Sequence, residues 1–145
     1  MASLERLVYR LHEAIYVGSG GRVGHRLILV PTLLLTTRGR RSGAPRTHAL
    51  VYARDSDGFV VVASNGGRDR PPAWFLNLQT DPEVGVQVGT KRMRATARVV
   101  ERGDPAYERL WRLVNENNHG RYDGYQRLTT RPIPLVVLTP VSAGP

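Results

Sequence analysis

The sequence contains no cysteine, and this absence removes several kinds of chemistry at once. Without thiols there can be no disulfide, no cysteine nucleophile and no cysteine-ligated zinc or iron–sulfur site. The histidines lack the spacing of metal ligands, and no catalytic triad is apparent. They are His12, His25, His48 and His119. The sequence therefore predicts neither a metal centre nor thiol chemistry.

Long apolar runs are also missing. No stretch of about 18 apolar residues is present, so the sequence predicts no membrane-spanning helix. Charged residues interrupt every early apolar run, which is not the pattern of a signal peptide. We therefore expect a cytoplasmic protein. Its 145 residues suit one domain, with an N-terminal helix and linker over residues 1–24 and a tail over residues 141–145.

Acidic residues are few compared with basic ones, and the formal net charge is +9. Such a balance favours anionic partners, which include phosphates, carboxylates, nucleic acid and anionic membrane surfaces. Of the 21 basic residues, 20 are arginine, a preference that can also reflect the base composition of the coding DNA. The charge alone does not choose among these partners.

Apolar spacing and turn residues predict the order helix, three strands, short helix, two strands, helix, one strand. The first three strands are predicted to form an antiparallel meander. Hairpin links between most strands favour a closed or partly closed, six-stranded antiparallel barrel with flanking helices, a mainly β member of the α+β class. The predicted strands are 27–37, 47–54, 59–63, 83–89, 91–100 and 135–139. The predicted helices are 3–17, 72–78 and one that opens at Asp104-Pro105, followed by a polar and aromatic loop to Gln126.

The segment Thr36–Arg46 is the most distinctive part of the sequence. Its glycines permit positive φ and close backbone approach to a ligand, and Pro45 restricts the loop. Arginine presents a planar set of donors that matches phosphate and carboxylate groups. Arg40, Arg41 and Arg46 are therefore candidate contacts of an anion-binding hairpin loop. The alternative is a solvated basic turn.

Three other stretches have both a functional and a purely structural interpretation. Ser64–Arg68 contains two adjacent glycines, which suits a loop with backbone N–H groups facing a ligand or an ordinary turn. The arginines that alternate along Lys91–Val100 favour a solvated face over a binding groove. The helix predicted at Ser3–Val17 most simply packs on the domain, and contact with a membrane surface is the alternative.

Three segments together resemble the deazaflavin (F420)-dependent nitroreductase family, within the split-barrel flavin and deazaflavin oxidoreductases. The first is LLTTRGRRSGAPR at residues 34–46. The second combines ASNGG at 63–67 with PAWFLNL at 72–78, and the third is RPIPLVV at 131–137. The matched span runs from about Pro31 to Pro140. Each motif is weak alone, but their order and spacing are specific together.

This resemblance implies a site for coenzyme F420, with FMN as the less favoured alternative. It implies that the basic loop binds the phosphate and acidic tail of the coenzyme, through Arg40, Arg41, Ser42, Gly43, Pro45 and Arg46. It also implies that the second loop lies against the deazaflavin ring and ribityl chain, through Ala63, Ser64, Asn65, Gly66 and Gly67, and that Trp74 and Asn77 close the site. Catalytic or substrate-side roles are implied for Tyr122 and Tyr125, with His119 at a third such position. Asn65 stands where the family often has lysine, and His119 where a tyrosine can occur.

The leading hypothesis is a reductase that transfers a hydride from reduced F420 to an electron-poor substrate such as a quinone, an enone or a nitro compound. The alternatives are an FMN- or haem-binding split-barrel protein, a non-enzymatic deazaflavin carrier, and a module that binds anionic ligands or membrane surfaces. Nucleic acid is not expected as a partner, because the arginines cluster at one loop instead of along an extended track. Either a monomer or a homodimer is compatible with the sequence.

Overall fold

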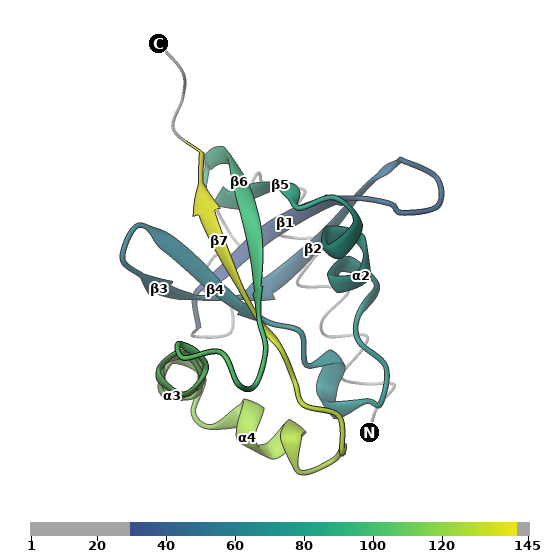
Figure 1. Ribbon diagram of the computed structural model, residues 1–145. Coiled ribbons are helices and arrows are strands. Elements are labelled where there is room, and N and C mark those ends of the chain that lie inside the picture. Colours follow the sequence, from purple (N-terminus) through teal and green to yellow (C-terminus); the bar gives the residue numbers. More distant parts are fainter. Residues whose placement is uncertain (1–29, 142–145) are drawn as a thin grey trace.

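The computed structural model describes residues 30–141, and these residues form one seven-stranded antiparallel sheet (Figure 1). The strand order is β2-β1-β5-β6-β7-β4-β3. The strands are β1 (Thr32–Arg38), β2 (Pro45–Val51), β3 (Ala53–Asp55), β4 (Gly58–Val62), β5 (Glu83–Val88), β6 (Lys91–Val100) and β7 (Leu135–Pro140). The mainly β antiparallel class was predicted correctly, and the sheet is a half-barrel of seven strands instead of the predicted six.

The additional strand arises where the predicted strand 47–54 divides at Tyr52. Residues before Tyr52 belong to β2 and pair with β1, whereas residues after it belong to β3 and pair with β4. The Tyr52 N–H donates to the carbonyl of Pro31 at 3.1 Å, and its own carbonyl accepts from the Asn117 side chain at 2.9 Å. Both antiparallel pairings of the predicted meander are present, but two separate strands make them, and β2 and β3 lie at opposite edges of the sheet.

The β5–β6 hairpin was predicted with nearly its observed limits. Glu83 pairs with Thr96 and Val88 pairs with Lys91, around a turn at Gly89-Thr90. β7 lies in the interior of the sheet, where it pairs with β6 on one side and β4 on the other. This arrangement joins the β3–β4 hairpin to the strands that bear the basic loop.

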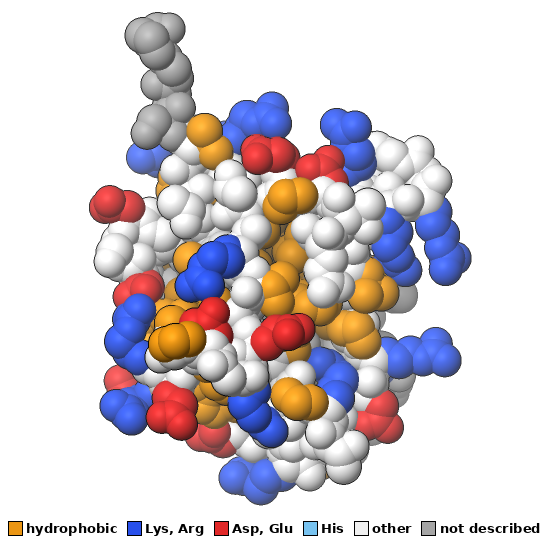
Figure 2. All heavy atoms as spheres, in the orientation of Figure 1, with side chains coloured by type: hydrophobic (Ala, Val, Ile, Leu, Met, Phe, Trp, Pro, Cys, Tyr) orange, Lys and Arg blue, Asp and Glu red, His pale blue; other side chains and the backbone are white. Residues whose placement is uncertain are grey.

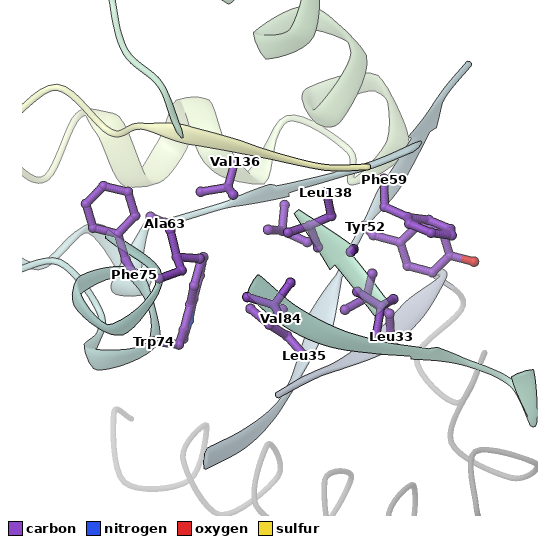
Figure 3. Packing of buried hydrophobic residues seen from close by; sticks show 14 residues of the cluster. Leu33, Leu35, Tyr52, Phe59, Ala63, Trp74, Phe75, Val84, Val136 and Leu138 are labelled. Carbon is purple, nitrogen blue, oxygen red and sulfur yellow. The ribbon is translucent and has the colours of Figure 1, made fainter. Parts of the chain in front are cut away.

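Buried side chains form two clusters. The first fills the inner side of the half-barrel and includes Leu33, Leu35, Trp74 and Leu138 (Figure 3). The second lies between the sheet and the last two helices and includes Val60, Leu110, Tyr122 and Ile133. The two clusters hold the helices on different sides of the sheet.

The helices are α2 (Ala73–Thr80), α3 (Tyr107–Asn117) and α4 (Arg121–Gln126), with a short 3-10 turn, η2, at Asn65–Gly67. Two details differ from the prediction. The helix expected to open at Asp104-Pro105 begins later, at Tyr107, and the Asp104 carboxylate accepts from the Ala106 N–H at 2.9 Å. The segment predicted as a polar loop after α3 contains α4, whose Gly124 obscured the helical pattern.

Some predictions fall on residues that the structure does not describe. The helix predicted at Ser3–Val17 and the tail after residue 141 lie outside residues 30–141. Among the described residues, none of the helices has the length and hydropathy that a membrane span requires.

Candidate functional site

The basic loop connects β1 to β2 and is closed by its own backbone. The Gly39 N–H donates to the Ala44 carbonyl at 2.7 Å, and the Gly43 N–H donates to the Gly39 carbonyl at 2.8 Å. Gly43 has φ of +75°, a conformation that glycine adopts without strain. The Ser42 hydroxyl accepts from the Ala44 N–H at 3.1 Å, so this serine stabilises the turn itself. The loop is therefore a defined turn that projects its arginines from the sheet.

Arg41 on this loop and Arg46 near the start of β2 are exposed, and neither side chain has an acidic partner within residues 30–141. Figure 2 shows basic side chains on the same side of the molecule as the loop joining β1 and β2 in Figure 1. Guanidinium groups without a carboxylate partner remain available to an external anion. Both side chains are exposed, and their role in anion binding stays a prediction.

Arg40 differs from its neighbours because Asn77 of α2 holds it. The side-chain oxygen of Asn77 accepts from the Arg40 backbone N–H at 3.2 Å and from its guanidinium at 3.0 Å. The Asn77 amide nitrogen donates to the Thr37 hydroxyl at 3.2 Å. Asn77 is buried, so its amide ties the loop to α2 and sets the direction of Arg40.

The second predicted loop follows β4 and has the geometry of a backbone anion nest. Ser64 is in the right-handed helical region, with φ −77° and ψ −33°, and Asn65 and Gly66 follow with φ of +47° and +66°. Successive N–H groups in such an arrangement form a concavity that binds anionic or carbonyl oxygens. The backbone N–H groups of Ser64 and Asn65 donate to no acceptor in the described part of the chain. A Cβ built on Gly66 meets nothing within 4 Å, so the loop faces open space there.

Arg131, which precedes β7, forms hydrogen bonds with the backbone carbonyls of this second loop. Its guanidinium donates to the carbonyls of Ser64 and Arg68 at 2.9 Å each, of Ala63 at 3.2 Å and of Arg70 at 3.3 Å. The Asn65 side chain donates to the Arg70 carbonyl at 2.9 Å. Sequence reasoning gave Arg131 no role beyond its place in a motif, because its acceptors are more than 60 residues away in the chain.

The C-terminal end of α4 packs directly on the second loop. A Cβ built on Gly67 would lie 2.7 Å from the Tyr125 carbonyl and 3.1 Å from Leu128. Only glycine fits this contact, which brings Tyr125 beside the loop. Tyr125 is half-buried, and its ring contacts that of Tyr122 with centroids 6.3 Å apart. Of the three residues predicted on the substrate side, Tyr125 is the one that the structure brings to the loop.

Tyr122 and His119 lie elsewhere. Tyr122 is only 6% exposed and belongs to the core cluster beneath α3. His119 is exposed at the junction of α3 and α4, in a cavity of about 620 Å³ that Trp111 and Asp123 also line. This junction lies well away from α2 and the basic loop in Figure 1. The structure therefore does not bring His119 to the two predicted loops.

Trp74 and Ala63 form an apolar support between the two loops. Both are buried in the first core cluster, and Figure 3 shows the Trp74 ring beside Ala63. Trp74 packs edge-to-face on Phe75 with centroids 6.4 Å apart. Trp74 is therefore part of the core, and its role in closing the site stays a prediction. α2 lies between the two loops, with Trp74 near its start and Asn77 in its middle.

The chain is similar to known proteins in both sequence and fold. The profile of a family described as F420H(2)-dependent quinone reductase matches residues 8–140. An F420H(2)-dependent quinone reductase of Mycobacterium tuberculosis is 53% identical over 131 residues, which cover 90% of this chain and 88% of the relative. A solved F420-H2 dependent reductase is 35% identical with a TM-score of 0.67, covering 74% of this chain and 93% of the other. Another solved structure, described as a domain-swapped dimer, is 30% identical with a TM-score of 0.69 and covers 94% of each chain. With its two loops in place and a relative at this level of identity, the chain belongs to the F420H(2)-dependent quinone reductase family.

Proposed function

We propose that this protein reduces a quinone to a hydroquinone with F420H2 as the hydride donor, and that the two loops joined by α2 hold the coenzyme. The assignment of the site rests mainly on Arg41, on a turn that the backbone fixes, and Arg46, beside that turn in β2; neither has an acidic partner within residues 30–141. A polyanionic tail and a phosphate are the ligands that such a pair suits best.

The residues present fit this coenzyme at both ends. Exposed guanidinium groups suit its acidic tail. The N–H groups of Ser64 and Asn65, which have no acceptor within residues 30–141, suit a ring edge that bears carbonyl oxygens. Bound reduced F420 supplies a hydride, and the quinone gains that hydride and a proton. The chain's own part is to bind, to orient the two partners and to exclude water.

Tyr125 is the proposed group on the substrate side. It lies next to Gly67, its position is fixed by the packing of α4 on that glycine, and a phenol can donate a hydrogen bond to a quinone oxygen. Tyr122 supports it through the ring contact, and His119 is not part of this site. Support for a homodimer comes from the relative described as a domain-swapped dimer, and we propose the same assembly for this chain.

The decisive experiment is a titration of the purified protein with F420 and, separately, with FMN, followed by the anaerobic oxidation of F420H2 by a soluble quinone. We expect F420 to bind at submicromolar to low-micromolar concentration, much more tightly than FMN, and quinone to be consumed in a one-to-one ratio with F420H2. FMN binding equal to or tighter than F420 binding would reject the coenzyme. F420 binding without quinone-dependent turnover would reject the enzyme and leave a carrier.

A further inference from the structure

Within residues 30–141, Arg131 donates hydrogen bonds only to backbone carbonyls, all of them in the segment 63–70. Its Nε donates to Arg68, and one terminal nitrogen is shared among the carbonyls of Ala63, Ser64 and Arg70. No acidic residue within residues 30–141 forms an ion pair with it. An arginine that satisfies four carbonyls of one loop determines the conformation of that loop.

The hydrogen bonds that Arg131 makes to these carbonyls also determine where the N–H groups of the same peptides point. A trans peptide is planar, and the N–H of each residue points away from the carbonyl of the residue before it. Because the Ala63 carbonyl faces Arg131, the Ser64 N–H faces away from it. Because the Ser64 carbonyl faces Arg131, the Asn65 N–H faces away as well. These are the two N–H groups that have no acceptor in the described part of the chain.

The loop also contains a residue in an uncommon backbone conformation. Asn65 has φ of +47°, in the left-handed region that few residues other than glycine and asparagine adopt. Arg131 and the Asn65 side chain share the Arg70 carbonyl as an acceptor, at 3.3 and 2.9 Å. The guanidinium is partly buried, which lowers the pKa of Arg131, and Asp69 opposes this shift. An arginine nevertheless remains protonated at neutral pH, so all its donors stay available.

We propose that Arg131 is a positioning residue for the coenzyme: it holds the peptide groups 63–64 and 64–65 so that the N–H groups of Ser64 and Asn65 face the bound deazaflavin. This inference rests on the proposed function, because it explains what keeps the second loop of that site in the conformation that binds the coenzyme. Arg131 touches the back of the loop and not the coenzyme.

The test compares Arg131→Lys and Arg131→Gln with the wild type. Lysine keeps the charge, but its ammonium group lacks the planar set of N–H donors of the guanidinium. It should therefore restore only part of the loop geometry. We expect F420 affinity to fall about tenfold in Arg131→Gln and less in Arg131→Lys, which corresponds to the loss of one hydrogen bond on binding. Because Arg131→Lys keeps the charge and changes only the geometry, its loss of affinity should be the same at low and high salt, unlike that of Arg41→Ala.

A second readout does not need the coenzyme. In the free protein, the Gly67 N–H donates to the Ser64 carbonyl at 2.9 Å and the Arg68 N–H donates to the Asn65 carbonyl at 3.3 Å. Hydrogen exchange of residues 63–70 should become faster in both Arg131 variants, because these bonds depend on the loop conformation. Exchange in β5 and β6 should not change.

The matched control is Arg109→Gln. This variant removes another guanidinium group, which donates two hydrogen bonds from α3 to Asp55. It should change F420 affinity less than twofold even if it lowers the melting temperature. Unchanged F420 affinity in a folded Arg131→Gln protein, or an equal loss in Arg109→Gln, would overturn the inference. Failure of the wild type to bind F420 would instead reject the proposed function, and the exchange measurement would still test the loop.

Discussion

The side-chain oxygen of Asn77 accepts two hydrogen bonds from Arg40, one from its backbone and one from its guanidinium. A single buried amide on α2 therefore fixes both the path of the basic loop and the direction of one of its arginines. The same amide donates to Thr37, which is itself buried at the end of β1. Loop, strand and helix meet at this residue.

Removal of Asn77 should mainly destabilise the fold. In Asn77→Ala the Thr37 hydroxyl and the Arg40 donors lose their partner, and an unsatisfied buried group costs about 1–3 kcal/mol. We expect that decrease in the free energy of unfolding in urea, with a smaller loss of F420 affinity than in Arg41→Ala. The exposed Gln79→Ala on the same helix is the control and should alter neither. A folded Asn77→Ala protein with unchanged stability and a large loss of affinity would mean that Asn77 contacts the coenzyme directly.

Arg41 should contribute to the affinity for F420 and not to the stability of the fold. A charge-assisted hydrogen bond contributes roughly 1.5–3 kcal/mol, so Arg41→Ala should weaken F420 binding about tenfold to a hundredfold. Arg41→Lys should recover part of the loss, and the difference from wild type should shrink at high salt. The measurement is the F420 dissociation constant at two ionic strengths, together with a melting curve for each protein.

The control for net charge is Arg112→Ala, an exposed arginine on α3 away from the basic loop. It should leave F420 affinity nearly unchanged. Equal affinities for wild type and a folded Arg41→Ala protein would show that the loop is a solvated turn.

Gly66 and Gly67 form a natural pair for testing the contact between α4 and the second loop. Both have positive φ, so alanine at either site carries a backbone cost of about 1–2 kcal/mol. At Gly67 the new methyl group would also lie 2.7 Å from the Tyr125 carbonyl, whereas at Gly66 it meets nothing. Overpacking of this kind costs about 1–3 kcal/mol more. Equal unfolding free energies of the two variants, measured in urea, would contradict the close packing of α4 on Gly67.

The roles of Tyr125 and Tyr122 can be distinguished by removing each hydroxyl group in turn. Tyr125→Phe should lower quinone turnover about tenfold, the effect of one hydrogen bond in the transition state, with little change in F420 affinity. Tyr122→Phe should alter the melting temperature and leave turnover closer to wild type, because its ring lies in the core. The check is steady-state turnover with F420H2 and a quinone for both variants. A greater loss of turnover in Tyr122→Phe would reverse the assignment.

The Asp55–Arg109 ion pair predicts a pH dependence of stability. The hydrogen bonds from Arg109 lower the pKa of Asp55, and partial burial opposes the shift. Because the folded-state pKa lies below the unfolded-state value of about 3.9, the stabilisation is complete above that value and disappears as pH falls through the folded-state pKa. Asp55→Asn should therefore melt slightly below wild type at pH 7, and the two should converge in acid. Asp57→Asn, in the same turn, should match wild type at both pH values.

The sequence predicted those parts of the fold that local patterns determine. The alternation along Lys91–Val100 predicted β6 and its hairpin, and the glycines and arginines of residues 39–46 predicted the basic loop. It did not predict the division at Tyr52, because neither glycine nor proline marks it and the bend depends on hydrogen bonds to Pro31 and Asn117. The role of Arg131 was missed for a similar reason, since its four acceptors become neighbours only after β7 has paired with β4.

The interior position of β7 has a consequence for the order of folding during synthesis. Each of the other six strands has a partner that precedes β7 in the chain, but β4 and β6 are joined to each other only through residues 135–140. Until those residues leave the ribosome, a nascent chain holds two separate β units, each with an open edge and an uncovered apolar face. Arg131 emerges just before β7, so the second loop acquires its support at the same late stage as the sheet closes.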